Sequence, residues 1–206
     1  FSLDAYLKET RDMLVKASIP ITSGFEDTTT TYTNAGKVRN QGLEMSLHTI
    51  NLTGELGWET NVTATYNKNK IKDLNSAVPY YINQINNSYV TMLAKDYPIN
   101  AFYGYVTDGL FQNQAEVDAH AVQPGAEPGD IRFRDLNNDG VINDSDRTVI
   151  GNPNPSWFFS MNNNLSYKGF ELSVFLQGVA GNKIYNANNI DNVGMAAAYN
   201  QTTDVL

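Results

Sequence analysis

Cysteine is absent from the 206 residues, and basic residues are few. Without cysteine the chain has no disulfide framework, no thiolate-bound metal and no cysteine nucleophile. Lys and Arg together number 14 against 22 Asp and Glu, which gives a formal net charge of −8 and a pI near 4.6. Because phosphate groups are bound by clustered Lys and Arg, this balance argues against a nucleic-acid partner and against polybasic attachment to an anionic membrane surface.

Long apolar runs and helical periodicity are also scarce. The chain has no run of about 18 apolar residues and a mean hydropathy of −0.38, so the sequence contains no candidate transmembrane helix. These numbers do not exclude a transmembrane β-barrel, whose strands alternate and average out as polar. Asn, Thr, Tyr, Gly and Ser are common and favour strands and turns. The two short helix candidates are residues 7–15, which also suit a strand, and residues 114–121.

Four segments alternate between apolar and polar residues with a period of two, as expected of strands with one apolar face. The apolar positions are Leu43, Met45 and Leu47; then Leu56, Trp58, Val62, Ala64 and Tyr66; then Trp157, Phe159, Met161, Leu165 and Tyr167; and finally Phe170, Leu172, Val174 and Leu176. Residues 1–7 suggest a fifth such segment. Strands of about ten residues are long enough to cross a bilayer at a steep tilt.

The connections between these segments differ greatly in length. A few residues around 51–54 join the first two segments, and residues 167–169 join the last two in a tight hairpin. A far longer stretch separates the second segment from the third. Short turns at one end and long loops at the other are typical of outer-membrane barrels. A secreted β-sandwich with a few long loops alternates in the same way, and on pattern alone both folds are supported equally.

The sharpest local motif is a twelve-residue stretch, residues 135–146, that matches a calcium-binding loop. Oxygen-bearing groups fall at the ligand positions, and a glycine at the sixth position permits the sharp turn. The predicted ligands are Asp135, Asn137, Asp139, the Val141 carbonyl, Asn143 through water, and Asp146. The motif predicts a structural Ca²⁺ site, with Mg²⁺ as the second choice, because the site is rich in carboxylates.

This loop departs from the EF-hand pattern in two ways. The twelfth position is Asp146 rather than Glu, and a shorter side chain is less suited to bidentate ligation, although dockerin-type loops use Asp there. Flanking helices are also not expected, because the residues before the loop look extended and prolines follow it. The alternative interpretation is an Asp-Gly turn in a solvated acidic loop.

Enzyme chemistry has no support in the sequence, and no catalytic residue is predicted. His48 and His120 are isolated and stand in unrelated contexts. Acidic pairs such as Glu26 and Asp27 suit solvated loops better than a glycosidase site, since nothing sets the distance between them. The chain shows neither a glycine-rich phosphate loop nor a serine nucleophile elbow.

Several runs of residues resemble SusC/RagA-type TonB-dependent transporters. The resemblance extends over nearly the whole chain, in order. It is carried by residues 40–45 (NQGLEM), 58–61 (WETN), 66–71 (YNKNKI), 102–105 (FYGY), 108–111 (DGLF), 129–142 (GDIRFRDLNNDGVI), 146–155 (DRTVIGNPNP) and 167–178 (YKGFELSVFLQG).

This resemblance implies an all-β fold, an antiparallel transmembrane β-barrel segment that is part of a large, plugged barrel of about 22 strands. Residues 1–206 would form part of one barrel domain and an internal fragment of the C-terminal half of the barrel. Residues 70–156 would form a long extracellular loop region that includes the ion loop. Whether residues 98–113 add barrel strands or loop structure stays open.

The resemblance also implies a function in the outer membrane of a Gram-negative bacterium. The chain would be part of a TonB-dependent importer of oligosaccharides or peptides that works with a SusD-like surface lipoprotein. TonB would act on an N-terminal region outside this sequence. The expected partners are therefore that lipoprotein, TonB, the substrate and membrane lipid.

Four tyrosines in the long connection are candidate substrate contacts, because flat aromatic faces suit the apolar faces of sugar rings. These are Tyr80, Tyr81, Tyr103 and Tyr105. The alternative role for them is packing within the loop. A soluble, secreted β-sandwich that binds ligands through a calcium-stiffened loop is the alternative function for the chain.

Overall fold

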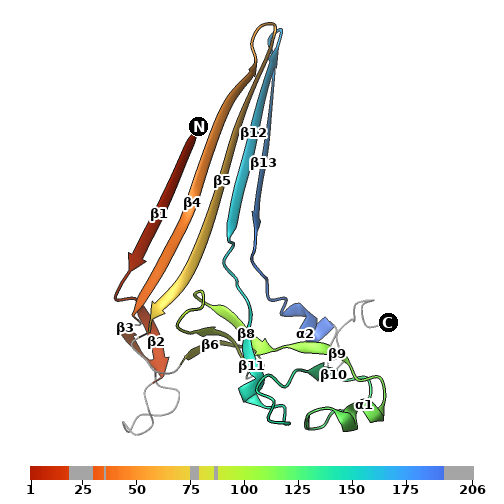
Figure 1. The fold of residues 1–206 in the computed structure, drawn as a ribbon. Coiled ribbons are helices and arrows are strands. Elements are labelled where there is room, and N and C mark those ends of the chain that lie inside the picture. Colours follow the sequence, from red (N-terminus) through yellow and green to blue (C-terminus); the bar gives the residue numbers. More distant parts are fainter. Residues whose placement is uncertain (19–29, 35, 75–78, 86–87, 193–206) are drawn as a thin grey trace.

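In the computed structural model, five long antiparallel strands stand side by side as one curved sheet (Figure 1). The structure describes residues 1–18, 30–34, 36–74, 79–85 and 88–192. The order across the sheet is β1-β4-β5-β12-β13, with β1 and β13 at the two edges. These strands are β1 (Ser2–Thr10), β4 (Lys37–Leu52), β5 (Leu56–Asp73), β12 (Trp157–Tyr167) and β13 (Phe170–Ala180).

The long connection between β5 and β12 folds into structure of its own. It contributes a four-stranded sheet in the order β11-β8-β7-β6 and a two-stranded sheet of β10 and β9. The strands are β6 (Tyr80–Ile85), β7 (Ser88–Leu93), β8 (Ala101–Tyr105), β9 (Thr107–Leu110), β10 (Ile131–Phe133) and β11 (Arg147–Gly151). Residues 98–113 therefore belong to these small sheets and add no strand to the large one.

Helices are short in the part of the chain that the structure describes. They are α1 (Gln114–Ala119), the 3₁₀ turn η2 (Asp144–Asp146) and α2 (Asn188–Asn192). None of the helices in the described ranges is long and apolar enough to cross a membrane. The helix expected at residues 114–121 is confirmed, with Asn113 as its N-cap.

The helix candidate at residues 7–15 is wrong. These residues end β1 and begin β2 (Leu14–Ser18), which pairs with β3 (Thr30–Asn34). Asp12 has a positive φ of 56° at the corner between β1 and β2. Pairing with β4 along the length of β1 outweighs the weak helical pattern, because the backbone groups of β1 that face β4 join a continuous ladder from Ser2 to Thr10.

The register of the sheet confirms the predicted apolar face. Met45, Ala64 and Phe159 lie opposite one another on β4, β5 and β12. Leu47 opposes Val62, which in turn opposes Met161. Because side chains alternate along each strand, this alignment collects the apolar positions on one face, which we call the outer face. The large side chains on it are exposed, and Leu172 has 59% of its surface accessible.

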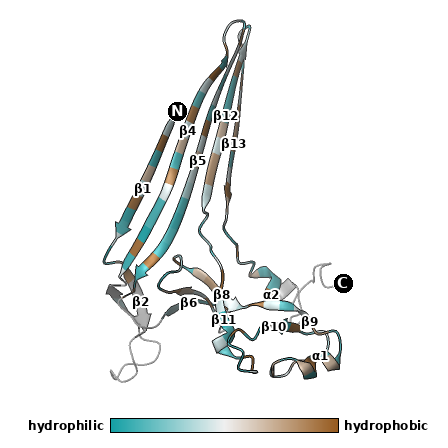
Figure 2. Cartoon of the chain, viewed as in Figure 1, coloured by the Kyte–Doolittle hydropathy of each residue, from teal (hydrophilic) through white to brown (hydrophobic). Residues whose placement is uncertain are grey.

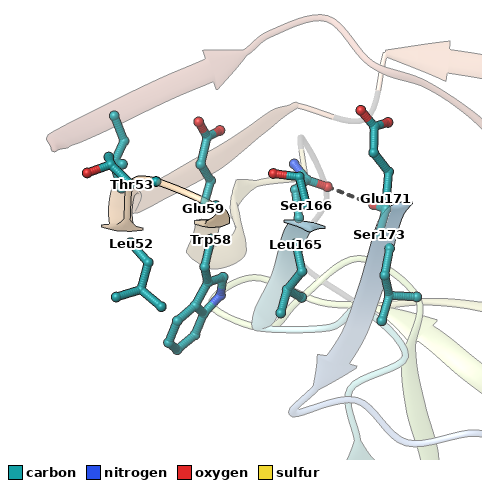
Figure 3. Close-up of a pocket in the computed structure, with 13 residues that line it drawn as sticks. Leu52, Thr53, Trp58, Glu59, Leu165, Ser166, Glu171 and Ser173 are labelled. Atoms are coloured by element: carbon teal, nitrogen blue, oxygen red, sulfur yellow. Dashed lines mark hydrogen bonds between the residues drawn. The ribbon is translucent and has the colours of Figure 1, made fainter. Parts of the chain in front are cut away.

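The close-up in Figure 3 shows this division at the end of the sheet near the tight turns. Leu52, Trp58 and Leu165 point to one side of the sheet, and Glu59 and Glu171 point to the other. These residues line a hollow at the ends of the strands, with side chains from both faces of the sheet. Its lining residues do not form a nucleophile–base pair. The polar atoms that interrupt the outer face here are paired, as Asn163 Oδ1 accepts from Thr60 Oγ1 at 2.7 Å and from Trp58 Nε1 at 3.1 Å.

The two tight turns lie at the same end of the sheet, as expected, and the long connection gathers at the other end (Figure 1). Lys168 of the β12–β13 turn approaches Glu55 of the β4–β5 turn at 3.8 Å. Gly169 has a positive φ of 85°, the conformation that the two-residue turn requires.

A cluster of buried apolar residues joins the sheet to the long connection. Val38 and Ile71, which face inward from β4 and β5, pack with Leu74 and with Leu93 of β7. Ile71 is only 1% exposed. The inner face of the sheet is therefore covered at this end, while its outer face is open.

Candidate functional site

The predicted ion loop is held by a regular series of side-chain-to-backbone hydrogen bonds. Asn137 Oδ1 accepts from the amide of Asp139 at 2.9 Å, and Asp139 Oδ1 accepts from the amide of Val141 at 2.9 Å. Asn143 Oδ1 accepts from the amide of Ser145 at 2.8 Å. Each of these side chains therefore bonds the amide two residues ahead, which keeps alternate side chains on the same side of the turn.

Two more carboxylates close the loop on itself. Asp135 Oδ2 accepts from the amide of Gly140 at 2.8 Å, across the turn where Gly140 has a positive φ of 83°. Asp146 is fully buried and accepts from the amides of Leu136 and Asn143 at 2.8 and 2.9 Å. These contacts bring the first and last predicted ligands to the same end of the loop.

The pKa of the Asp146 carboxyl lies below its ordinary value. The largest cause is the hydrogen bond from the Asn143 amide, and the Leu136 amide acts in the same direction, while desolvation opposes both. A carboxylate that accepts amide bonds is favoured in its charged form. Asp146 therefore contributes loop stability that is present above its ordinary pKa and is lost as the pH falls through the lowered one.

The donor set is made of oxygen atoms, which suits a hard cation, but the side chains also satisfy one another. Asn137 Nδ2 donates to Asp139 Oδ2 at 2.9 Å, and Asn143 Nδ2 donates to the Val141 carbonyl at 3.4 Å. No group of three or more His, Cys, Asp or Glu side chains arranged for a metal occurs among the described residues. The loop therefore has the required ligand types, and binding needs these two amide contacts to be replaced.

The flanks of the loop are extended, as the sequence predicted. β10 precedes the loop and β11 follows η2 directly. The loop also pairs with a distant segment, since Val122 and Val141 form a parallel bridge and the Ile142 amide donates to the Val122 carbonyl at 2.9 Å. Ile142 is buried, which anchors the middle of the loop.

Three of the four candidate tyrosines lie together on one face of the β11-β8-β7-β6 sheet. The rings of Tyr81 and Tyr103 are 4.9 Å apart, and Tyr105 follows two residues after Tyr103 on β8. Tyr80 does not join them, because consecutive residues of β6 point to opposite faces, and it packs instead against the Ile71 cluster.

Arg147 organises this aromatic face and was not predicted as a site residue. Its guanidinium carbon lies 4.4 Å from the ring centre of Tyr103 and 5.7 Å from that of Tyr105. Its Nε is buried and has no hydrogen-bond partner in the described part of the chain. A cation stacked on tyrosine rings is stabilised by their π-electron density.

Charge links the aromatic face to the ion loop. Asp144 of η2 accepts from the Tyr105 hydroxyl at 3.3 Å and lies 3.7 Å from Arg147. Burial raises the pKa of Tyr103 to about 12, with a further contribution from the Tyr81 hydroxyl. Burial and then the Asp144 charge raise the pKa of Tyr105. Both tyrosines are therefore neutral hydroxyl groups at physiological pH.

Tyr89 and Phe133 extend the aromatic face, and sequence reasoning missed them as well. Tyr89 lies 5.9 Å from Tyr81, and Phe133 lies 4.9 Å from Tyr105. Tyr89 and Phe133 lie in strands that are too short for a period of two to be recognised in the sequence. The only sequence feature that could have pointed to Arg147 is its position directly after the ion loop.

An open antiparallel sheet with an exposed apolar outer face, a polar inner face and short turns at one end is a segment of a transmembrane β-barrel. A match to a family model over residues 1–193 makes the assignment specific. The chain belongs to the TonB dependent receptor-like, beta-barrel family.

Similar proteins carry the same family name. TonB-dependent receptor P26 of Formosa agariphila is 33% identical over an alignment of 187 positions, which covers 89% of this chain and 19% of that protein. TonB-dependent receptor SusC of Bacteroides thetaiotaomicron is 25% identical over an alignment of 217 positions, which covers 98% of this chain and 20% of that protein. The chain thus spans about a fifth of the length of these relatives.

A solved structure shows the same fold. The structure of the RagAB peptide transporter superposes with a TM-score of 0.71 at 20% sequence identity, and the match covers 93% of this chain and 20% of that one. The "closed-closed" state of the RagAB peptide importer matches with a TM-score of 0.61 at 22% identity over 87% of this chain and 19% of that one. The predicted fold class is confirmed.

Proposed function

We propose that the chain is part of an outer-membrane, TonB-dependent importer that takes up oligosaccharides. The observation that carries this proposal is the exposed outer face of the large sheet, on a chain whose family is that of TonB-dependent receptors. A face lined with Leu172, Val174 and Leu176 is stable against hydrocarbon, whereas water would disfavour it. The relatives are named as receptors, and none of the names denotes an enzyme.

The alternative of a soluble β-sandwich is not favoured. A sandwich requires a second sheet packed over the apolar face at about 10 Å. In the described part of the chain the small sheets lie at the end of the large sheet that is away from the tight turns, and the outer face stays open (Figure 1). Lipid is the partner that this face fits.

The proposed assembly follows from the family. Residues 1–206 contribute one part of a single barrel domain, and residues 70–156 form its extracellular loop region. A SusD-like lipoprotein covers the extracellular side and presents the substrate, and TonB acts on an N-terminal region outside this sequence. Peptides are the second candidate substrate class, since the RagAB structure carries the description of a peptide transporter.

Deleting the gene for this protein should abolish the uptake of labelled oligosaccharides from a mixture by living cells, and deleting TonB should have the same effect. Passive diffusion through a plugged barrel is too slow to replace energised transport. The measurement compares labelled oligosaccharide and labelled peptide mixtures in wild type and in both deletion strains. Loss of peptide uptake alone would shift the assignment to peptides. Unchanged uptake of both mixtures without TonB would overturn the importer proposal.

We also propose that residues 135–146 bind Ca²⁺ as a structural ion. The support is the oxygen-only set of Asp135, Asn137, Asp139, Asp146 and the Val141 carbonyl, held on one turn by the hydrogen bonds described above. Ca²⁺ accepts six to eight oxygen ligands with flexible geometry, and Mg²⁺ demands a near-ideal octahedron. The ion would neutralise neighbouring carboxylates and stiffen an extracellular loop; it has no chemical step to perform.

A calcium chelator should increase the rate of proteolysis within residues 120–146 of the purified full-length protein by roughly tenfold or more, because neighbouring carboxylates repel one another without a cation. Asp139→Ala should be cleaved fast with or without chelator. Asp118→Asn, which removes an exposed carboxylate outside the loop, serves as the control.

Adding back Ca²⁺ should restore protection at lower concentration than Mg²⁺. The same protease added to intact cells that carry Asp139→Ala should cut this loop and leave the turn at residues 53–55 intact if the long connection is extracellular. If the chelator does not change the rate of proteolysis of the wild-type protein, the loop binds no ion and the motif is only an Asp-Gly turn.

A further inference from the structure

β4 and β5 are longer than a bilayer crossing requires. They have 16 and 18 residues, whereas β12 and β13 have 11 each. The outer-face run of β5 from Leu56 to Tyr66 rises roughly 33 Å along the strand, or about 25 Å in height at a tilt of 35–45°. This matches the apolar band of an outer-membrane barrel. Tyr66 and Trp157, whose rings are 4.9 Å apart, mark the edge of that band.

The outer face becomes basic directly beyond this aromatic pair. The period of two places Lys68, Lys70 and Lys72 of β5 on the same face as Tyr66. Arg39 lies opposite Lys70 in the register of β4 and β5, and Lys37 reaches the same face, since it contacts Glu9, the partner of Arg39 on β1. We call these five residues the basic belt: Lys37, Arg39, Lys68, Lys70 and Lys72.

The belt cannot turn inward. At the same height the inner face is occupied by Val38 and Ile71, both buried in the apolar cluster. Figure 2 shows hydrophilic colour over the ends of β1, β4 and β5 that are away from the tight turns. The cationic groups therefore stay on the outside, roughly 5–15 Å beyond the apolar band, from which their side chains can reach the depth of lipid headgroups.

Carboxylates neutralise only part of the belt. Glu9 holds Arg39 at 2.7 Å and Lys37 at 3.8 Å, and Asp96 holds Lys70 at 3.0 Å. Lys68 is exposed and makes no ion pair within the described ranges. Asp73, which lies opposite Lys37 at the end of β5, is a third carboxylate near the belt. Five cations against three carboxylates still leave a positive surface on a chain with a net charge of −8. The negative net charge of the chain argued against attraction to an anionic leaflet. The local charge at the belt has the opposite sign.

The other edge of the apolar band carries no such belt. At the tight turns the outer residues are Leu56, Tyr167 and Phe170, and the nearby Lys168 approaches Glu55 at 3.8 Å. Among the described residues, the positive charge of the outer face is therefore concentrated at one of the two membrane surfaces, the one on the side of the long connection.

We propose that the basic belt binds the phosphate groups of an anionic lipid in the leaflet on the side of the long connection. Lys offers a point charge and Arg a planar fork, and both suit phosphate oxygens. Each basic residue near an anionic membrane surface strengthens attachment roughly fivefold. The proposal rests on the proposed function, because it requires the sheet to lie in a membrane with its apolar band at the height derived above.

The test uses the full-length protein, purified in detergent and mixed with micelles that contain either phosphatidic acid or phosphatidylcholine. Native mass spectrometry reports the lipids that stay bound. The variant Arg39→Gln/Lys68→Gln/Lys70→Gln removes three belt cations. The matched control, Lys8→Gln/Lys168→Gln/Lys183→Gln, removes three cations outside the belt, including Lys8 on the inner face of β1.

Wild type and the control should prefer phosphatidic acid over phosphatidylcholine, and the belt variant should bind phosphatidic acid at least about tenfold more weakly. Equal binding by the belt variant and wild type would overturn the proposal. So would competition by inorganic phosphate at equal concentration, which would assign the site to free phosphate. Heat-modifiable migration on a gel checks that each variant is a folded barrel. If wild type itself does not form one in membranes, the proposed function fails, and the two failures are thereby distinguished.

Discussion

Met161→Arg should reduce the yield of folded protein in the outer membrane more strongly than any other single charge placed on β12. Met161 lies at the middle of the outer face, opposite Val62 on β5 and Leu176 on β13. Arg at the midplane of a barrel's lipid face costs about 2–4 kcal/mol, and about 0–1 kcal/mol near the interface. The measurement is the fraction of full-length protein that folds into liposomes across a urea series.

A depth series supplies the controls for this prediction. Tyr167→Arg, at the turn end of the same face, should cost far less than Met161→Arg. Asn162→Arg places the same charge at the same depth on the inner face, where Asn162 accepts from Ser173 Oγ at 3.1 Å, and should be tolerated better. If Asn162→Arg is the more damaging of the two neighbours, the apolar face is not the lipid face and the membrane orientation of the sheet is wrong.

The strands that cross the membrane could be predicted from sequence because their pattern is long and uninterrupted. Lipid on one side and a polar interior on the other require strict alternation, and ten or more residues of it can be recognised without a structure. The helix expected at residues 7–15 failed for the opposite reason. Its pattern is short and fits two periods, and pairing of β1 with β4 decides between them.

The long connection was harder to interpret, because its strands have only three to six residues. Alternation over so few positions cannot be separated from chance. The separation of Tyr80 from Tyr81 follows from their being neighbours on a strand, once β6 is known to exist. The stacking of Arg147 on Tyr103 could not be predicted, because β8 and β11 pair across more than forty residues of chain.

The ion loop shows a different limit. Its hydrogen-bond pattern follows from Asp, Asn and Gly at fixed spacing, which the sequence displays directly. Ion occupancy depends on the competition between a cation and the amide contacts of Asn137 and Asn143, and sequence carries no measure of that balance. The loop is therefore predictable as a conformation, and its metal remains the proposal stated above.

Ile71→Ala should release the long connection from the sheet and leave the membrane-spanning part intact. Ile71 is 1% exposed and belongs to the cluster that joins β5 to Leu93 of β7 and to Tyr80 of β6. Truncating a buried isoleucine to alanine costs about 2–5 kcal/mol, because the removed atoms leave a cavity. The transmembrane strands are held by their ladder of backbone hydrogen bonds and by lipid, and this cluster contributes to neither.

The measurement for Ile71→Ala is therefore a comparison of two signals in one protein. Heat-modifiable migration, which reports the closed barrel, should be unchanged, while protease cleavage within the described residues 79–85 and 88–100 should accelerate strongly. Ile71→Val, which costs about 0.5–1.5 kcal/mol, should give a small acceleration. Leu172→Ala, which truncates an exposed outer-face side chain, should give none. Joint loss of both signals in Ile71→Ala would mean that the cluster also holds the barrel together, and the long connection would then be an integral part of the membrane domain.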